Sequence, residues 1–456
     1  MTAADDLAAE GRDALRPRGR KAQLETSRLR AGWTTGACAC AAATSAFVAL
    51  HTRDFPDPVE IVLPGSRQTA FALTQSQLEP RRAMAAVTKD AGDDPDVTHG
   101  AVIRAVVEPG EPGSGVRFLG GEGVGVVTLP GLPLHVGEPA INPRPREYIT
   151  ANIVSAAQRL GVAADVRVTV SIDDGERIAE RTWNRRIGIV GGLSVLGTTG
   201  VVVPYSCSAW IASIHRGIDV AVAAGVTHAA ACTGSTSERV AEELYPGIEL
   251  LDMGDFAGAV LKYLRRHPLP RLSIVGGVAK LSKLAAGHLD LHSHRTRIQP
   301  GHLRRLVAAH GAPPELQEAI EEVNTVAHAV TLAADAGIDL AALIAREARQ
   351  EALAVLDGAP VEVEVVIIDR AGAVLATAGW PGDRGEASES AGDGGSSRKP
   401  CPLRLGLKVA EKQVAVHHRL VVGDDHGLAG QVVIALCHPD QLRRLRRRGG
   451  LVDHDD

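Results

Sequence analysis

The densest group of ionisable side chains in this sequence lies between residues 89 and 99. It holds one lysine, four aspartates and one histidine: Lys89, Asp90, Asp93, Asp94, Asp96 and His99. Hard cations prefer clustered carboxylates, but this spacing is not that of a calcium-binding loop. The same groups can bind anions or move a proton. We therefore expect a substrate-facing loop here, with a solvated acidic turn as the alternative.

Two glycine-rich turns that follow apolar segments predict a cofactor site. Residues 186–192 read Arg-Ile-Gly-Ile-Val-Gly-Gly, and residues 271–277 nearly repeat them as Arg-Leu-Ser-Ile-Val-Gly-Gly. Ligands of open parallel sheets bind at the carboxyl ends of the strands, where glycine lets the backbone approach closely. The repeat predicts that the strands at 187–190 and 272–275 belong to one sheet and end at the same edge.

Polar turns at the other predicted strand ends extend this candidate site. We expect the cofactor to contact Gly191, Gly192, Gly197, Thr198, Thr199, Thr233, Gly234, Ser235, Asp255, Gly276 and Gly277. A dinucleotide is disfavoured because Gly188-x-x-Gly191-Gly192 lacks the Gly-x-Gly-x-x-Gly spacing. The second predicted strand also ends in Cys232-Thr233-Gly234, where a ribose-binding acid is expected. Strand-to-helix turns and helix caps without a ligand are the alternative.

Composition limits the class of protein. The chain has 456 residues, of which 45% are hydrophobic and 3% aromatic, and its formal net charge is -5. An aliphatic core follows, and the overall charge gives no case for a nucleic-acid partner. The six cysteines form no Cys-x-x-Cys pair, and neither a signal peptide nor an apolar run of about 18 residues is present. We therefore expect a cytoplasmic protein without a membrane partner; association into a homo-oligomer stays open.

The pattern of strands and helices changes along the chain and predicts a fold with both α+β and α/β parts. The expected parts are a disordered extension at 1–28, an α+β substrate-shaping domain at 29–183, a doubly wound, Rossmann-like parallel-sheet domain at 184–298, a helical pair and closing hairpin at 299–380, a flexible linker at 381–399 and a small C-terminal tail module at 400–456. The domains at 29–183 and 184–298 are thus expected to have different functions.

Six ordered motifs resemble one known family. They lie at residues 29–36, 89–100, 120–125, 137–143, 197–206 and 292–295. The sequence between them and around them resembles the CbiD-type cobalt-precorrin-5B C1-methyltransferases of anaerobic cobalamin biosynthesis, from about Leu29 to Trp380. Val126 stands where this family more often has a polar or basic residue, and the chain after Trp380 lies outside the pattern.

The resemblance implies that S-adenosylmethionine donates a methyl group to carbon C1 of cobalt-precorrin-5B, which gives cobalt-precorrin-6A. The cobalt then belongs to the substrate, and we predict no metal site in the protein. S-adenosylmethionine carries no phosphate, so the glycine loops would allow close backbone contact with the ligand. Asp252 or Asp255 would bind a ribose hydroxyl or the adenine amine, with helix capping as an equal alternative.

A corrin precursor carries many carboxylates, so the resemblance also implies local cations and polar groups. Substrate contacts are expected from Thr34, Thr35, Gly36, Glu122, Asn142, Tyr205, Ser206, Lys280, Lys283 and Arg295. Catalytic or acid–base roles are expected from Lys89, Asp90, Asp93, His99, His292 and His294. A zinc site at His292-x-His294 is disfavoured because no third ligand is placed.

Two other functions stay open from the sequence. A tetrapyrrole reductase that depends on NAD(P)H would use similar glycine-rich strand ends. A non-catalytic tetrapyrrole-binding or handover protein would bind the intermediate but never consume the methyl donor. The family resemblance, and no single residue, favours the methyltransferase.

Overall fold

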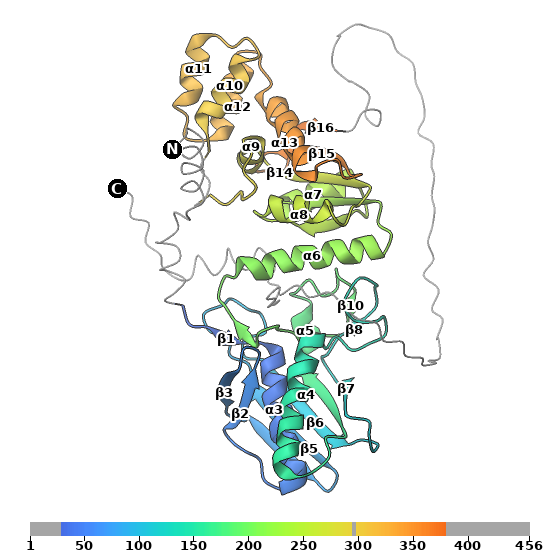
Figure 1. Ribbon diagram of the computed structural model, residues 1–456. Coiled ribbons are helices and arrows are strands. Elements are labelled where there is room, and N and C mark those ends of the chain that lie inside the picture. The colour runs from blue at the N-terminus through green and yellow to red at the C-terminus, as the bar shows by residue number, and fades with distance from the viewer. Residues whose placement is uncertain (1–28, 294–297, 380–456) are drawn as a thin grey trace, which may run out of the picture. The chain divides into compact units, whose positions relative to one another are not determined.

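The computed structural model describes residues 29–293 and 298–379, and these contain two main hydrophobic cores. One core draws its residues from positions 37–195 and the other from positions 214–378. We describe them as the first region (29–206) and the second region (207–379), shown in Figure 1. The predicted extension, linker and tail module lie outside the described residues.

The first region is built around a buried helix and a five-stranded sheet. The helices are α3 (Thr35–Thr52), α4 (Pro143–Leu160) and the short α5 (Gly175–Ala179), and the sheet order is β4-β5-β6-β9-β7. The strands are β4 (Gln75–Glu79), β5 (Arg82–Thr88), β6 (Val102–Pro109), β7 (Val116–Gly120) and β9 (Val166–Ile172), and β2 (Val59–Leu63) pairs with β3 (Arg67–Phe71) beside them. The sequence pattern predicts strands near 83–88, 102–107 and 166–172 and a helix at 143–160, and β5, β6, β9 and α4 confirm them.

Helix α3 is the centre of this core. By length and composition alone it could cross a membrane, but 78% of its most apolar window is buried inside the protein. Its first two turns contain alanine, cysteine and glycine, and residues 37–43 are fully buried. Such small side chains let the helix lie close to β5, β6 and α4. Burial on this scale identifies α3 as a core helix of a globular region.

Two short ribbons complete the first region and correct one prediction. Strand β1 (Gly32–Trp33) pairs with β11 (Val201–Val202), and β8 (Val126–Val127) pairs with β10 (Ile189–Val190), both antiparallel. The segment 187–190 therefore does not enter the parallel sheet. The near repeat at 186–192 and 271–277 reflects similar local composition, and the two Gly-Gly turns lie on different sheets.

The second region holds a parallel sheet with strand order β13-β12-β14-β15-β16. Its strands are β12 (His228–Cys232), β13 (Glu249–Asp252), β14 (Arg271–Gly277), β15 (Glu362–Ile368) and the antiparallel β16 (Val374–Ala378). The connecting helices are α6 (Cys207–Ala223), α7 (Ser235–Leu244), α8 (Ala257–Leu264) and α9 (Val278–Ala285). Numbered along this sheet, the order is 2-1-3-4-5, so the topology switches direction between β12 and β14.

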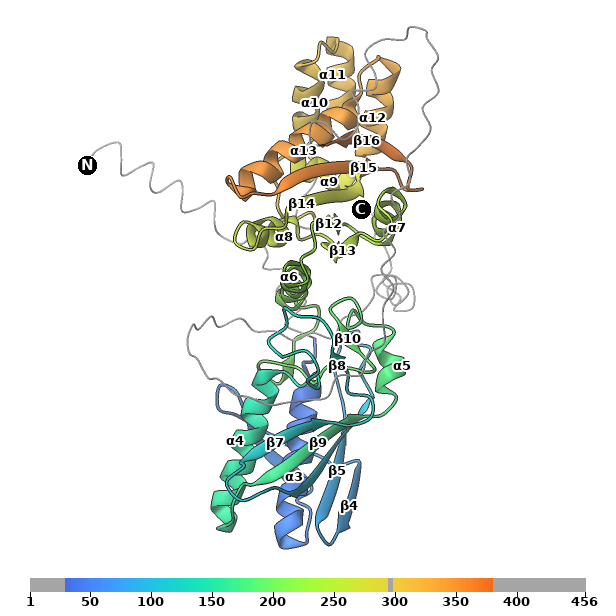
Figure 2. The same ribbon diagram turned by 90° about the vertical axis from the view of Figure 1, so that its right-hand side faces the viewer.

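Both faces of this sheet are covered, as a doubly wound fold requires. Ala229 and Ala231 belong to the larger core with α8 and α9, whereas Ala230 and Cys232 belong to a smaller cluster with α7. Figure 2 shows α7 and α8 on opposite sides of the strands. Strands buried on both faces are continuously apolar, and this explains the unbroken Ala-Ala-Ala-Cys run of β12.

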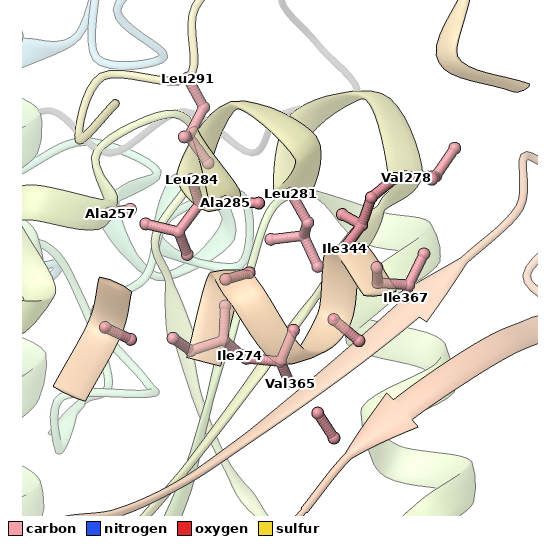
Figure 3. Close-up of a cluster of buried hydrophobic side chains, with 14 of the residues drawn as sticks. Ala257, Ile274, Val278, Leu281, Leu284, Ala285, Leu291, Ile344, Val365 and Ile367 are labelled. Carbon is pink, nitrogen blue, oxygen red and sulfur yellow. The ribbon is translucent and has the colours of Figure 1, made fainter. Parts of the chain in front are cut away.

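The segment 299–379 differs from its predicted form. It contains four helices among the described residues: α10 (Pro300–Ala308), α11 (Pro314–Glu321), α12 (Val326–Asp335) and α13 (Leu340–Leu356). The predicted closing hairpin, β15 and β16, is part of the main sheet, because β15 pairs in parallel with β14 over the whole length of both strands. Helix α13 packs with α9 over Ile274 and Val365, and Ile344 lies among them (Figure 3).

Candidate active site

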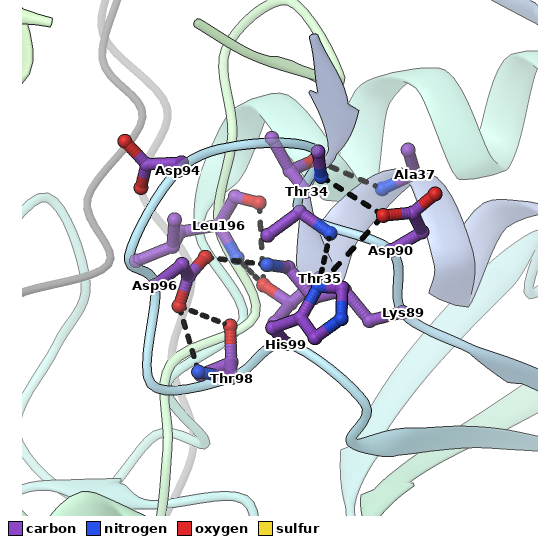
Figure 4. A network of polar contacts seen from close by, with 12 residues as sticks. Thr34, Thr35, Ala37, Lys89, Asp90, Asp94, Asp96, Thr98, His99 and Leu196 are labelled. Carbon is purple, nitrogen blue, oxygen red and sulfur yellow. Dashed lines mark hydrogen bonds and ion pairs between the residues drawn. The ribbon is translucent and has the colours of Figure 1, made fainter. Parts of the chain in front are cut away.

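The 89–99 loop of the first region packs over the start of α3 (Figure 4). The Thr34 hydroxyl accepts a hydrogen bond from the Ala37 N–H at 3.1 Å and so caps the helix. Lys89 forms an ion pair with Asp96, and both side chains are 1% exposed. Asp96 also accepts hydrogen bonds from the Thr98 N–H at 2.7 Å and the Thr98 hydroxyl at 2.6 Å. The loop is thus fixed by a buried and fully used charge pair.

This burial changes the predicted role of Lys89. We expected its ammonium group to bind a substrate carboxylate, but Asp96 already neutralises it away from solvent. Neither charge is free for a ligand without breaking the pair. The motif's lysine therefore serves the shape of the loop in this structure, because a buried charge needs a buried partner.

The solvent side of the same loop carries the remaining predicted groups. Arg30 pairs with Asp90, and this contact holds the pKa of Asp90 at about 2. Asp93 accepts the Arg30 backbone N–H at 2.6 Å. His99 accepts the Ala91 N–H at Nδ1 at 3.1 Å, and its side chain is 55% exposed. Of the three predicted groups on this side, Asp93 and His99 are exposed and Asp90 is half-buried.

The sequence prediction gave no role of its own to Asp94, which the structure links to Tyr205. The Tyr205 backbone N–H donates to the Asp94 carboxylate at 2.9 Å, and Tyr205 adopts a φ of 55° with 57% of its surface exposed. A tyrosine in left-handed backbone conformation is uncommon and is held by its surroundings. Burial raises the pKa of Asp94 to about 6. Ser206 is used locally, because its hydroxyl caps α6 through the Ala209 N–H.

The predicted glycine loop at 191–200 packs against the chain itself. A Cβ atom on Gly192 would overlap the Gly123 carbonyl oxygen, and one on Gly197 would overlap the Thr34 side chain. Gly36 is filled in the same way by the Tyr148 hydroxyl. These glycines allow close contact between backbones, so the alternative of a tight turn without ligand describes Gly192 and Gly197 in this structure. Gly191 differs, since a Cβ atom at that position would meet no other atom within 4 Å.

The neighbouring polar residues of the first region hold the same packing together. The Thr35 hydroxyl accepts the Leu196 N–H at 3.0 Å, and the Asn142 N–H donates to Val195 at 3.0 Å. Thr199 bonds to Val201 within its own turn. Thr198 also interacts with a partner group, and Glu122 is exposed in the loop after β7. The first region therefore brings these predicted site residues together. Several of them form hydrogen bonds within the protein that hold its packing.

The carboxyl edge of the parallel sheet gathers the second group of candidates. Thr233, Gly234 and Ser235 follow β12, Asp255 follows β13, and Gly276 and Gly277 end β14. Lys280 on α9 joins all three strand ends, because its Nζ donates to the Thr233 carbonyl at 2.7 Å and lies 3.0 Å from the Asp255 carboxylate. These residues meet at the switch point between β12 and β14, where ligands bind in this kind of sheet.

Two glycines at this edge face open space. No atom lies within 4 Å of a Cβ built on Gly234 or on Gly277. Gly234 has φ 155° and ψ 179°, a combination essentially confined to glycine, whereas Gly277 has an ordinary backbone with φ -65° and ψ 145°. No packing or backbone demand explains Gly277. A ligand that approaches the backbone closely would explain it.

Two predicted contacts at this edge are used by the protein. Lys283 is buried and donates from Nζ to the Leu291 carbonyl at 2.8 Å, and burial lowers its pKa. It is therefore not free to meet a substrate carboxylate. His292 lies in the loop after α9, where its backbone N–H donates to the Asp290 carboxylate at 3.1 Å. It therefore belongs to the second region, whereas the 89–99 loop belongs to the first. His294 and Arg295 lie outside the described residues.

Asp252, one of the two acids expected to contact ribose or adenine, ends β13 and so occupies a different place in the sheet from the one predicted. With 187–190 taken as the first strand, the ribose-binding acid was sought at Cys232. With β12 first, β13 is second and ends in Asp252, 20 residues after Cys232. Of the two grounds on which a dinucleotide was disfavoured, the one that placed Cys232 at the end of the second strand is therefore wrong. Among the described residues, no cluster of three or more His, Cys, Asp or Glu side chains is placed to hold a metal ion.

Comparisons with known proteins agree with the class of fold, a mixed α/β chain with two cores. The family model named CbiD matches residues 22–204, and the model of the CbiD C-terminal domain matches residues 290–379. The chain therefore belongs to the CbiD family. Residues 205–289, which include α6 to α9 and most of the sheet edge, lie between the two matches.

Similar proteins bear the name of one enzyme. A cobalt-precorrin-5B C(1)-methyltransferase of Brucella canis is 54% identical over 354 residues, which are 77% of this chain and 96% of that protein. The enzyme of the same name from Brucella melitensis biotype 2 is 54% identical over 355 residues with the same coverage. A crystal structure of the cobalamin biosynthesis protein CbiD from Archaeoglobus fulgidus is 27% identical, with a TM-score of 0.33 over 60% of this chain and 88% of that one.

Proposed function

We propose that this protein is a cytoplasmic methyltransferase that adds a methyl group to carbon C1 of cobalt-precorrin-5B, with S-adenosylmethionine as the donor. The names of relatives that are 54% identical over 77% of the chain support the reaction. The donor supplies an already activated methyl group. The protein has then to bind and orient two partners, and orientation can contribute a large part of the rate enhancement.

We place the donor at the carboxyl edge of the parallel sheet. The observation that carries this placement is the open backbone at Gly234 and Gly277, on both sides of the switch point. Lys280 would meet the donor's carboxylate, and Asp255 beside it would meet the donor's ammonium group. Of the donor contacts predicted at 191–199, we reassign Gly192 and Gly197 to close packing and Thr199 to a local turn of the first region.

We place the corrin substrate against the first region. The groups that support this are the exposed His99 and Tyr205, which flank the loop held by Lys89 and Asp96. His99 can donate a hydrogen bond to a peripheral carboxylate, and Tyr205 offers an aromatic face to the macrocycle. The buried ion pair keeps the loop rigid, so these side chains are positioned before substrate arrives.

Binding of S-adenosylhomocysteine, measured by calorimetry, tests the donor site. Gly277→Ala adds one methyl group in open space on an ordinary backbone, so the fold should be unaffected while affinity falls at least about tenfold. Gly301→Ala on α10 is the matched control, because its Cβ also meets no atom within 4 Å. Equal affinity in wild type and Gly277→Ala would remove the donor from this edge.

The reaction itself is tested with purified cobalt-precorrin-5B and a donor labelled in its methyl group. The proposal requires S-adenosylhomocysteine and a C1-methylated product. Corrinoid binding without consumption of the donor would instead identify a handover protein. A separate titration with NADPH covers the reductase alternative, which requires binding of that dinucleotide.

A further inference from the structure

The carboxylate of Asp252 is buried without a partner at the proposed donor edge. Asp252 is 2% exposed, and neither of its carboxylate oxygens has a hydrogen-bond partner among the residues that the structure describes. Leaving a buried acceptor unsatisfied costs about 1–3 kcal/mol, and more for a charged group. Buried polar groups of native proteins nearly always have a hydrogen-bond partner, and a ligand can be that partner. Asp252 is therefore a residue whose environment is incomplete without a ligand.

The charges around Asp252 do not replace that missing partner. Arg186 is engaged by Glu238 in a two-pronged ion pair, with N–O distances of 2.8 and 3.2 Å. Lys280 is held by Thr233 and Asp255. Neither cation forms a hydrogen bond with the Asp252 carboxylate, and the neighbouring Glu238 carboxylate opposes a second negative charge. Burial and, to a smaller extent, the charge of Glu238 raise the pKa of Asp252 to about 7.

A second buried polar group without a partner lies close by. The indole N–H of Trp183 has no acceptor, although the residue is 7% exposed. Trp183 packs edge to face on Trp210 with ring centroids 6.0 Å apart, and the Trp210 N–H donates to the Asp252 carbonyl at 3.3 Å. Two of the chain's four tryptophans therefore meet beside Asp252, in a chain that is 3% aromatic. An unfilled donor and an unfilled acceptor in one place indicate a ligand that offers both.

We propose that the Asp252 carboxylate accepts hydrogen bonds from the ribose hydroxyl groups of the methyl donor. The inference rests on the donor site proposed above and decides between the two acids that the sequence left open. An acid at the end of the second strand, about 20 residues after the first, holds ribose hydroxyls in other doubly wound folds. A ribose diol supplies two O–H donors for the two empty carboxylate oxygens, which the ordered neighbours do not.

Asp252→Asn tests this role by calorimetry with S-adenosylhomocysteine. The change keeps the shape of the side chain and removes the charge, so affinity should fall at least about tenfold, as for a charge-assisted hydrogen bond. Glu243→Gln on α7 is the matched control, because Glu243 is an exposed acid paired with Arg239, and its affinity should stay at the wild-type value. Unchanged affinity in a folded Asp252→Asn protein overturns the inference while leaving the donor site in place.

A second ligand identifies which part of the donor is bound. 5′-Methylthioadenosine keeps the ribose but lacks the amino-acid end, so Asp252→Asn should weaken it by a similar factor. A loss confined to S-adenosylhomocysteine would mean that Asp252 meets the ammonium group, which overturns the ribose assignment. Wild-type protein that binds neither compound, alone or with substrate present, would overturn the donor proposal itself.

The wild-type protein offers a test that needs no variant. 2′-Deoxy-S-adenosylhomocysteine should bind at least about tenfold more weakly than the parent compound. Affinity for the parent should also fall from pH 8 to pH 6, because a protonated Asp252 loses acceptor capacity beside Glu238, Arg186 and Lys280. Equal affinity for the deoxy compound, or a pH response that persists in Asp252→Asn, would contradict the assignment.

Discussion

The two regions of this protein differ in what lies beside most of their predicted ligand-binding glycines, although Gly191 of the first region is open and Gly276 of the second is filled by Thr233. In the first region, side chains on Gly36, Gly192 and Gly197 would overlap atoms of the protein itself. In the second region, side chains on Gly234 and Gly277 would meet no atom within 4 Å. The same residue type therefore marks close chain packing in one place and exposed backbone in the other. A glycine-rich motif indicates a ligand only where the space beside it is empty.

Buried charges differ between the regions in the same way. Lys89 and Asp96 satisfy each other beneath the start of α3, and Thr98 fills the remaining acceptor sites of Asp96. Asp252 is just as buried but has no partner for either oxygen. The buried ion pair of the first region is thus satisfied within the protein, whereas Asp252 at the edge of the second has no partner among the described residues and is proposed to gain one from a ligand. Four predictions on stability test this difference.

The largest effect is expected from breaking the buried ion pair of the first region. Lys89→Met leaves Asp96 charged in the core, and the loss of one partner of a buried pair costs about 3–5 kcal/mol. Chemical denaturation followed by circular dichroism measures the change. The double variant Lys89→Met, Asp96→Asn removes both charges and keeps an acceptor for Thr98, so most of the stability should return. A single variant as stable as wild type would mean that the pair is not the anchor of this loop.

The next effect separates the two kinds of glycine directly. Gly192→Ala places a methyl group on the Gly123 carbonyl and should destabilise the protein by about 1–3 kcal/mol or more. Gly277→Ala adds the same group in empty space at an ordinary φ, so stability should stay the same or rise by up to about 1 kcal/mol. Urea denaturation of both variants compares them. Equal effects at the two positions would abolish the distinction between packing and open glycines.

The regular elements were predictable because local pattern decides them. The helix at 143–160 has a proline at its first position and a clear apolar face, and the alternation at 166–172 matches β9. The alternation of strands with helical stretches identified β12, β13 and β14 as parallel strands. The 89–99 loop was also predicted as one unit, and the structure places it over the start of α3 (Figure 4), whereas its part in catalysis stays a prediction.

The errors came from partners that are distant in sequence. Nothing local in 187–190 shows that it pairs with Val126–Val127 and not with the parallel sheet. That one misplacement shifted the count of strands, so that Cys232 and not Asp252 was taken as the end of the second strand. The burial of Lys89, which was expected to take a catalytic role, depends on the packing of its loop over α3, a segment distant in sequence. Open and filled glycines likewise differ only in what lies beside them in three dimensions.

Removing the unpartnered charge of the second region should stabilise the protein. The folded-state pKa of Asp252, about 7, lies above its ordinary value of 3.8, so the folded protein holds this proton more tightly than the unfolded chain. The stabilising contribution of the proton is full below about pH 4 and is lost as pH rises through 7. Asp252→Asn should therefore be about 1–3 kcal/mol more stable than wild type at pH 8. The gap should close at pH 4 in parallel denaturation series, and a constant gap would mean that Asp252 does not titrate in this range.

The smallest effect compares one helix cap in each region. Thr34 caps α3 from a buried position, and the exposed Thr325 caps α12 through the His328 N–H at 3.2 Å. Loss of such a cap costs about 0.5–2 kcal/mol. Thr34→Ala should lie at the upper end of that range, because it also opens a gap beside Gly197 in a closely packed site. Thr325→Ala should lie at the lower end, since water can replace the lost hydroxyl. Equal losses of stability in thermal or urea denaturation would mean that the start of α3 is no more tightly packed than an exposed helix end. The contrast between the packed start of α3 and the open sheet edge would then depend on the glycines and the buried charges alone.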